Sequence, residues 1–425
     1  MSENVMNDTS ETETVVVSRG VKKVILALQH LIAMFGATVL VPVLTGFDTS
    51  VALVSAGAGT LIFHAVTKKK VPVFLGSSFA FIGGIIAVKE AHNGDLAYAQ
   101  GGIVVAGLIY ILVSLLISKI GIDFIKKFLP SHVIGPMIIV IGLNLVPVAY
   151  GMASGNFLLA IVTLGTALAI NFFTKGFFKQ LSILIAVVVG YTLAFVLGQV
   201  DPASLVNAPL FSVPAFTLPK FSFSAIAVLA PVVLAVFMEH VGDITTNGQV
   251  VGKDFIKNPG LNRTFLGDGL ATLLAGLIGG PANTTYGENT GVLAITKNYD
   301  PSVLRLAAVF AIVLGFVSKI GGFLGTIPTS VMGGISMMLF SMIALIGVQT
   351  IQNNKVQFSK VNVAVMVVML ILGLWESYFQ NVTGIHIGIK INEVISITGL
   401  SLAAMVGVAL NAVLTVLVPP QKKSA

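Results

Sequence analysis

Apolar residues occur in long runs along most of the chain, and short polar or basic intervals separate these runs. A helix that crosses the hydrocarbon core of a bilayer needs about 20 mainly apolar residues. The pattern therefore predicts an all-α polytopic membrane protein with fourteen transmembrane segments, some of them short. The predicted segments are 22–44, 50–66, 70–89, 97–119, 124–149, 156–174, 180–199, 223–242, 264–282, 284–297, 302–325, 328–351, 361–379 and 394–418.

The composition agrees with residence in a lipid bilayer. Charged residues make up 10% of the chain, against about 25% in soluble proteins, and hydrophobic residues make up 56% with a mean hydropathy of +0.98. The absence of cysteine excludes disulfides, thiolate catalysis and cysteine-based metal sites. Residues 1–20 are polar and acidic, so we expect a disordered cytoplasmic tail there rather than a secretory signal.

Basic residues concentrate at alternate ends of the predicted segments. If both termini are cytoplasmic, all of the 24 Lys and Arg residues fall on the inner side except Lys89, Lys220, Lys319 and Lys390. This positive-inside distribution predicts a multi-pass protein of the cytoplasmic membrane with both ends inside. Because no single element gathers the net charge of +7, we expect no nucleic-acid partner.

The two halves of the chain resemble each other on either side of the long, proline-rich interval 200–222. The run Pro130-Ser131-His132 opens the fifth predicted segment, and Pro328-Thr329-Ser330 opens the twelfth. The run Ser77-Ser78-Phe79 in the third segment matches Thr284-Thr285-Tyr286 in the tenth. Both matches are seven segments apart, and since seven is odd, the second copy crosses the membrane in the opposite sense. We therefore predict an inverted repeat, which is common in secondary transporters.

The third and tenth segments are short and interrupted by Ser/Thr–aromatic–small runs, Ser77–Phe81 and Thr284–Gly287, which we interpret as extended backbone. Non-helical backbone at membrane depth survives only where protein buries it or where it lines a cavity. Paired breaks at matching positions of two repeats indicate a binding site, and helices that start at such breaks direct their N–H groups into it.

Three carboxylates belong to these apolar regions: Glu288 in the second break, and Glu239 with Asp243 one helical turn later. A charge at membrane depth is costly, about 2.5 to more than 10 kcal/mol, so each is a candidate functional group. A structural alternative remains for each, and it is strongest for Asp243, which lies nearest the end of its segment. His30 lies in the middle of the first segment and is equally compatible with a structural or a substrate role. We expect Asp268, in the first turn of its segment, to be structural.

Several runs resemble the nucleobase–ascorbate transporter family, also called the nucleobase:cation symporter-2 family, and within it the bacterial uracil permeases. These runs are QHLIAMFGATVLVP (29–42), LGSSFAFI (75–82), EHVGD (239–243), NPGL (258–261) and GGPANTTYGENTGVLAIT (279–296). The resemblance covers nearly the whole chain after residue 20. It implies two inverted seven-segment repeats that form a core and a gate, elevator-like movement of the core, and a homodimer. The implied division is a core of 21–119 and 223–326, a gate of 120–222 and 327–418, and cytoplasmic tails of 1–20 and 419–425.

The resemblance also implies roles for individual residues. Glu239 and Glu288 would accept the ring N–H groups of uracil, and Phe79 would lie against the ring. The backbone N–H groups of Phe79 and Gly287 would meet the carbonyl groups of the base. The remaining substrate-side positions are Tyr286, Ala80 and His30, and the positions of the family signature are Asn289, Gly291 and Thr296. Uracil has two N–H donors and two carbonyl acceptors, and this set of groups complements them.

Uphill transport of a neutral base needs a co-transported ion, and we expect proton symport with Glu288 or Asp243 as the switching group. Some similar proton-coupled uracil carriers have a histidine where Asp243 stands, so the identity of the carrier group stays open, as does sodium coupling. No metal ion or other cofactor is expected.

Three other functions are alternatives to uracil transport. Transport of xanthine or another purine is the alternative within the family. An anion exchanger of a related seven-plus-seven fold is disfavoured because two carboxylates at one site would repel an anion. An intramembrane enzyme is disfavoured because the chain has no cysteine and no HExxH motif, and its six histidines are scattered.

Overall fold

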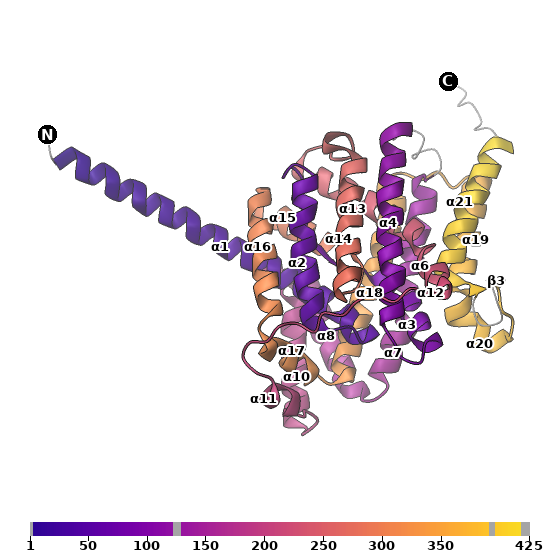
Figure 1. The fold of residues 1–425 in the computed structure, drawn as a ribbon, viewed down its shortest axis with the longest axis horizontal. Helices are drawn as coiled ribbons and strands as arrows, with labels where there is room; N and C mark the ends of the chain where they lie inside the picture. Colours follow the sequence, from indigo (N-terminus) through magenta and orange to yellow (C-terminus); the bar gives the residue numbers. More distant parts are fainter. Residues whose placement is uncertain (1–2, 122–128, 391–395, 418–425) are drawn as a thin grey trace.

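The computed structural model describes residues 3–121, 129–390 and 396–417, and these are predominantly helical (Figure 1). The longer helices are α1 (Glu3–Thr45), α2 (Thr49–Val66), α3 (Ile82–Ala91), α4 (Ala97–Ile120), α6 (Ser131–Asn144), α7 (Val146–Ala153), α8 (Phe157–Phe173), α10 (Ser182–Val196), α13 (Val232–Val251), α14 (Leu261–Ile278), α15 (Gly287–Thr296), α16 (Pro301–Gly315), α17 (Ser318–Gly325), α18 (Thr329–Asn353), α19 (Lys360–Leu374) and α21 (Gly399–Leu417). The short elements are η1 (Phe79–Phe81), α9 (Phe177–Gln180), α11 (Ala203–Asn207), α12 (Phe223–Leu229), η2 (Ile256–Gly260), η3 (Trp375–Phe379) and α20 (Gln380–Thr383).

The predicted tail 419–425 lies outside the described residues, as do the first residues of the predicted segments 124–149 and 394–418.

Local signals in the sequence explain where several helices begin and end. The carboxylate of Asp48 accepts the N–H of Val51 at 2.9 Å and caps the start of α2. Asp300 caps α16 in the same way, with Pro301 as its first residue, where the missing N–H of proline costs nothing. Helix α13 ends where Gly252 adopts φ +75°, a conformation that glycine tolerates without strain.

Length and hydropathy identify seven helices of the described chain that could cross a membrane, or eight if the bent pair α16–α17 is one span. The protein is therefore a multi-pass membrane protein. The other predicted segments fall on shorter apolar helices (α8, α10 and α21), on α14, and on the two broken segments that contain α3 and α15. The number of fourteen crossings stays a prediction.

The N-terminal segment differs from the expected disordered tail. Helix α1 begins at Glu3 and continues without a break into the first apolar segment, and its N-terminal part projects away from the other helices (Figure 1). No proline or glycine precedes Gly20, and extending an existing helix avoids the cost of nucleating a new one.

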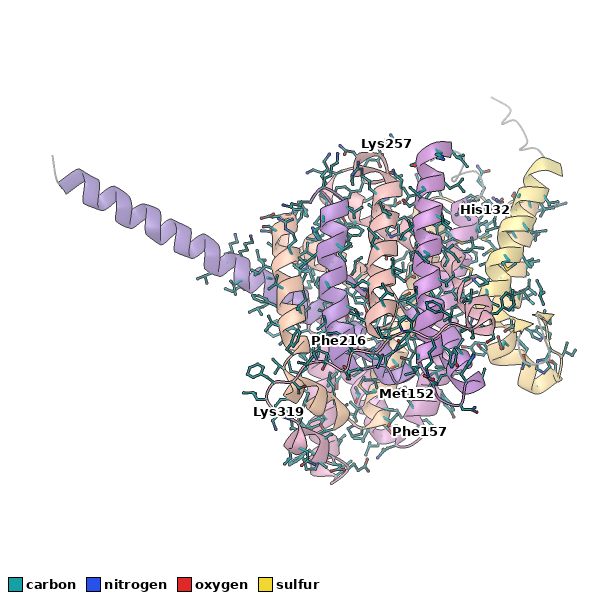
Figure 2. All side chains as sticks on the ribbon, viewed as in Figure 1. His132, Met152, Phe157, Phe216, Lys257 and Lys319 are labelled. Carbon is teal, nitrogen blue, oxygen red and sulfur yellow. The ribbon has the colours of Figure 1, made fainter. Side chains whose placement is uncertain are left out.

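The helices pack in two sets. In one set, α14 packs against α2 and α4, and α16 packs against α1 and α2. In the other set, α18 packs against α6, α7 and α8, while α19 packs against α6 and α21. Helix α13 contacts both sets, through α15 on one side and through α6 and α21 on the other. Figure 2 shows Lys257 at one end of this bundle and Lys319 at the opposite end.

The two predicted breaks are confirmed as short strands that pair with each other. Strand β1 (Leu75–Ser77) runs antiparallel to β2 (Asn283–Thr285), with Leu75 opposite Thr285 and Ser77 opposite Asn283. The prediction was wrong for Phe79–Phe81, which forms the 3₁₀ turn η1 instead of extended backbone. The second sheet is a small antiparallel pair of β3 (Ile389–Lys390) and β4 (Ser396–Ile397).

Candidate functional site

Hydrogen bonds on both sides of the β1–β2 pair extend the contact between the two breaks. The N–H of Ser78 donates to the carbonyl of Ala282 at 2.7 Å, and the N–H of Tyr286 donates to that of Phe74 at 3.0 Å. The phenol of Tyr286 donates to the carbonyl of Ser77 at 2.9 Å. Tyr286 therefore ties the strands together, and its hydroxyl is already occupied within the protein.

Buried hydroxyl and carbonyl groups of two helices hold the strands from the other side. The hydroxyl of Thr60 on α2 accepts the N–H of Leu75 at 2.9 Å, and the hydroxyl of Thr272 on α14 donates to the carbonyl of Asn283 at 2.9 Å. The amide of Asn283 also donates to the carbonyl of Ser55 at 3.1 Å. These contacts give strand backbone inside an apolar bundle the partners that lipid cannot supply.

Each strand leads directly into a helical turn that starts at a residue assigned to the ligand site. Phe79 begins η1 after β1, and Gly287 begins α15 after β2. The first N–H groups of a helix have no intrahelical acceptor, and the positive end of the helix dipole lies there. Backbone donors without an intrahelical acceptor are therefore expected at the starts of η1 and α15, and Glu288 lies in the first turn of α15.

The three predicted carboxylates meet at this point. Glu239 and Asp243 lie one turn apart on α13, and each interacts electrostatically with Glu288 on α15. Asp243 accepts a hydrogen bond from the hydroxyl of Thr285 at 3.0 Å. The Oε2 atom of Glu239 is buried and has no hydrogen-bond partner in the described part of the chain. The Oε2 atom of Glu239 is therefore an acceptor that a ligand could use next to the β1–β2 pair.

The sequence analysis missed a buried polar contact between α13 and α14, and its Asp268 also interacts electrostatically with Glu239 and Asp243. His240 Nδ1 lies 2.8 Å from Asp268 Oδ2, and Nε2 lies 2.9 Å from the hydroxyl of Thr264, with the His240 and Asp268 side chains fully buried. Asp268 does not lie in a first turn, because α14 begins at Leu261. The sequence held a partial signal for this contact. Adjacent residues of a helix point in different directions, so His240 must face a different neighbour from Glu239.

His30 and Asn289 form a second buried contact, between α1 and α15. The Asn289 amide nitrogen donates to the carbonyl of His30 at 3.0 Å and lies 3.1 Å from its Nδ1. Because this amide nitrogen only donates, Nδ1 accepts, and the neutral ring carries its proton on Nε2. His30 thus holds the helix that carries Glu288.

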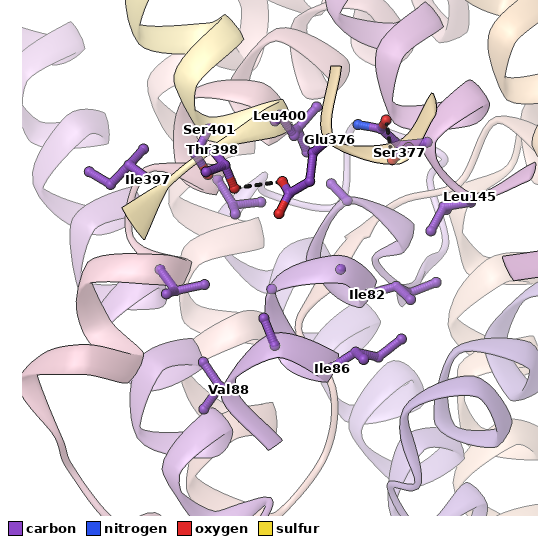
Figure 3. Close-up of a pocket in the computed structure, with 18 of the residues that line it drawn as sticks. Ile82, Ile86, Val88, Leu145, Glu376, Ser377, Ile397, Thr398, Leu400 and Ser401 are labelled. Carbon is purple, nitrogen blue, oxygen red and sulfur yellow. Dashed lines mark hydrogen bonds between the residues drawn. The ribbon is translucent and has the colours of Figure 1, made fainter. Parts of the chain in front are cut away.

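Phe79 and Ala80 face a cavity of about 440 Å³ that separates the two sets of helices. The Phe79 ring meets Phe340 of α18 edge to face, with ring centroids 5.9 Å apart. Figure 3 shows this cavity with the short helix α3 on one side and Glu376 and Thr398 on the other. Phe79 and Ala80 therefore connect the candidate site to a cavity between the helix sets, whose walls do not include Glu239, Asp243 or Glu288.

Two signature residues lie further along α15, away from the carboxylates. Gly291 is exposed, and a Cβ atom added there would meet nothing within 4 Å. Thr296 ends α15, and its hydroxyl donates to the carbonyl of Val292 within the same helix. The structure gives no physical reason for glycine at position 291.

The arrangement combines carboxylate acceptors, free backbone donors and an aromatic ring around one point. A planar, uncharged molecule with several N–H and carbonyl groups complements such a set, because the acceptors and donors face it from different elements. An anion would face the Glu239, Asp243 and Glu288 carboxylates together.

Solved structures with a similar fold are transporters. The chain is similar to SLC26A9, with a TM-score of 0.70 at 10% identity over 95% of this chain and 66% of that chain. It is also similar to the transmembrane domain of the cyanobacterial bicarbonate transporter BicA, with a TM-score of 0.60 at 14% identity over 92% of this chain and 96% of that domain. At these identities the likeness concerns the fold alone.

Sequence comparison is more specific. Residues 21–382 match the model of a permease family. The chain is 42% identical to the uracil permease of Bacillus caldolyticus over 92% of this chain and 91% of that protein. It is 41% identical to a probable uracil permease of Haemophilus influenzae, over 92% of this chain and 94% of that protein, and 37% identical to the uracil permease of Escherichia coli K12, over 91% and 90%. The chain therefore belongs to the nucleobase:cation symporter-2 family of permeases, as its motifs predicted.

Proposed function

We propose that this protein imports uracil across the cytoplasmic membrane by proton symport. One observation carries the proposal: Glu239 and Glu288 interact beside the paired strands β1 and β2. The Oε2 atom of Glu239 has no hydrogen-bond partner there in the described chain. Similarity to uracil permeases, at about 40% identity over most of the chain, supports uracil as the base.

In the proposed complex, Glu239 and Glu288 accept the two ring N–H groups of uracil. The backbone N–H groups of Phe79 and Gly287 serve its carbonyl groups, and the Phe79 ring covers one face. Ala80 forms part of the wall beside Phe79. Tyr286 acts indirectly, because its hydroxyl already binds the carbonyl of Ser77. His30 supports α15 through its carbonyl and Nδ1, which both contact Asn289.

The proposed architecture is an inverted repeat of seven plus seven segments with both termini in the cytoplasm. Two matched positions support it: β1 pairs with β2, and Pro130 and Pro328 occupy the same capping position before α6 and α18, which pack together. The core (21–119 and 223–326) would then move against the gate (120–222 and 327–418) in an elevator-like step, within a homodimer.

Proton coupling follows from the electrostatics of the site. Glu239, Asp243 and Glu288, with Asp268 beside them, bring like charges into one apolar region, where their repulsion is weakly screened. A proton bound to Asp243 or Glu288 relieves this repulsion, so proton and base can favour each other's binding. Collapsing the proton gradient at constant sodium should abolish accumulation; accumulation that follows sodium instead would contradict the proton assignment.

Uptake of labelled uracil, in cells that lack their own pyrimidine carrier, tests the function and the site together. The wild type should accumulate uracil, whereas Glu239→Gln and Glu288→Gln should lose about tenfold or more in uptake efficiency, because a hydrogen bond to a charged acceptor contributes about 1.5–3 kcal/mol. The exposed Glu90→Gln variant is the matched control. Normal uptake by both site variants would refute the assignment. Stronger competition of labelled uracil uptake by excess xanthine than by the same excess of unlabelled uracil would identify a purine carrier.

A further inference from the structure

The cavity between the two sets of helices continues beyond the proposed uracil site. Phe79 and Ala80 line its inner end, and Ala91 and His92 at the end of α3 line its far end. A ligand that passes through this cavity toward Phe79 must move along its walls. In the proposed orientation this is the path from outside the cell.

The two walls of the cavity differ in polarity. Helix α3 contributes mainly apolar side chains, including Ile82 and Ile86, whereas the opposite wall carries the carboxylate of Glu376 (Figure 3). Thr398 donates a hydrogen bond to Oε2 of Glu376 at 2.5 Å. In the described part of the chain, no hydrogen bond or ion pair involves the other oxygen, Oε1.

The backbone around Glu376 is irregular. Glu376 belongs to η3, a π-helical turn that interrupts the end of α19, and such turns are frequent at functional sites. The neighbouring polar groups are already satisfied: Ser377 donates to Oδ1 of Asn144, whose amide nitrogen donates to the carbonyl of Gly373. Glu376 is therefore the carboxylate of this wall, and its Oε1 atom is left for a ligand in the described part of the chain.

We propose that Glu376 forms a second, outer recognition subsite for the same class of ligand, a neutral planar base with N–H donors, on its way to Glu239 and Glu288. This inference rests on the proposed function. The Glu376 carboxylate accepts an N–H of the base, and the flat ring lies against the apolar side of the cavity at Ile82 and Ile86. A single carboxylate facing apolar side chains lacks the several oxygen ligands that a hard metal cation requires.

The chain carries its own reporter for this subsite. Trp375 is its single tryptophan and directly precedes Glu376 in η3. Purified full-length Glu288→Gln protein, with the inner site disabled, should therefore still show a saturable change in Trp375 fluorescence on titration with uracil. Adding Glu376→Gln should abolish the change or raise the half-saturating concentration about tenfold, since a hydrogen bond to a charged acceptor is lost.

Two controls distinguish binding at Glu376 from a general effect of lost charge or lost folding. Glu288→Gln/Glu90→Gln removes an exposed carboxylate of α3 that does not line the cavity, and it should respond like Glu288→Gln alone. Thermal unfolding of both double variants should match that of Glu288→Gln alone, because Glu376 and Glu90 are exposed.

Absence of any uracil response in Glu288→Gln would overturn the subsite, even if wild-type uptake of uracil succeeds. A fluorescence change of the same size and midpoint in Glu288→Gln/Glu376→Gln would also overturn the subsite. So would a change that sodium chloride produces and uracil does not. Conversely, a Glu376-dependent response with no uracil uptake by the wild type would leave the subsite standing while the proposed transport function fails.

Discussion

Among the described residues, Asp243 has a side-chain hydrogen-bond partner, whereas Glu239 and Glu288 have none. The hydroxyl of Thr285 donates to Oδ2 of Asp243 at 3.0 Å, and Thr285 belongs to β2, which leads into the helix that carries Glu288. A proton on Asp243 would change this bond and thereby act on the strand, without Asp243 having to touch the base. Asp243 is therefore suited to coupling, and Glu239 and Glu288 are suited to binding.

This division predicts separate effects of two variants. Asp243→Asn should abolish uracil accumulation driven by a proton gradient, yet keep exchange of internal for external uracil within a few-fold of wild type. Glu288→Gln should lose both activities by about tenfold or more, because it removes a charged acceptor for the base. Reconstituted vesicles allow both measurements on one preparation.

The exposed Asp254→Asn variant controls for a general effect of removing a carboxylate near α13. Proton-driven accumulation by Asp243→Asn at the wild-type level would show that another group, Glu288 first, carries the proton.

Single residues also mark what the sequence could and could not predict of the site. The carboxylates could be predicted because a charge in an apolar run is conspicuous whatever its partner. The His240–Asp268 contact could not be predicted, because its partners are 28 residues apart on two helices and either side chain alone is compatible with a structural role. Tyr286 was expected at the wall of the site, but only the fold shows that its hydroxyl binds Ser77.

At the scale of elements, the strand pair depends on very close packing at Gly76. A Cβ atom added to Gly76 would overlap the ring of Tyr286 and lie 2.7 Å from the hydroxyl of Thr38. The ring of Tyr286 cannot withdraw easily, because its hydroxyl and its backbone N–H are both bonded to the β1 side of the pair. A larger residue at Gly76 must therefore push the two strands apart.

Gly76→Ala should consequently abolish uracil uptake and lower the thermal stability of the purified protein, by about 1–3 kcal/mol as for overpacked cores. Gly165→Ala on α8, where an added Cβ atom meets nothing within 4 Å, should leave uptake unchanged and stability within about 0.5 kcal/mol. Wild-type uptake and melting temperature in Gly76→Ala would show that the close approach is not needed.

The positions of the breaks were predictable, but their geometry was not. Short Ser/Thr–aromatic–small runs inside apolar segments predicted interrupted helices, and both became strands of three residues. The antiparallel pairing of Gly76 with Thr284, and the 3₁₀ turn that starts at Phe79, depend on partners about two hundred residues away. Such short strands have no stability alone and take their conformation from the helices around them.

At the scale of the whole molecule, the proposed elevator step requires that the two sets of helices slide past each other. Helix α1 of the first set approaches α10 of the second at Gly36, where an added Cβ atom would lie 3.9 Å from the Cβ atom of Ile183. This separation is within the range for a disulfide. Since the chain has no cysteine, a pair introduced here would be the only one present.

Oxidised Gly36→Cys/Ile183→Cys should therefore lose nearly all uracil uptake and regain it on reduction, while each single variant transports in both conditions. Full uptake by the cross-linked α1–α10 pair would mean that the two sets of helices do not slide past each other at this contact. Access to Glu239 and Glu288 would then alternate through smaller movements near the β1–β2 pair.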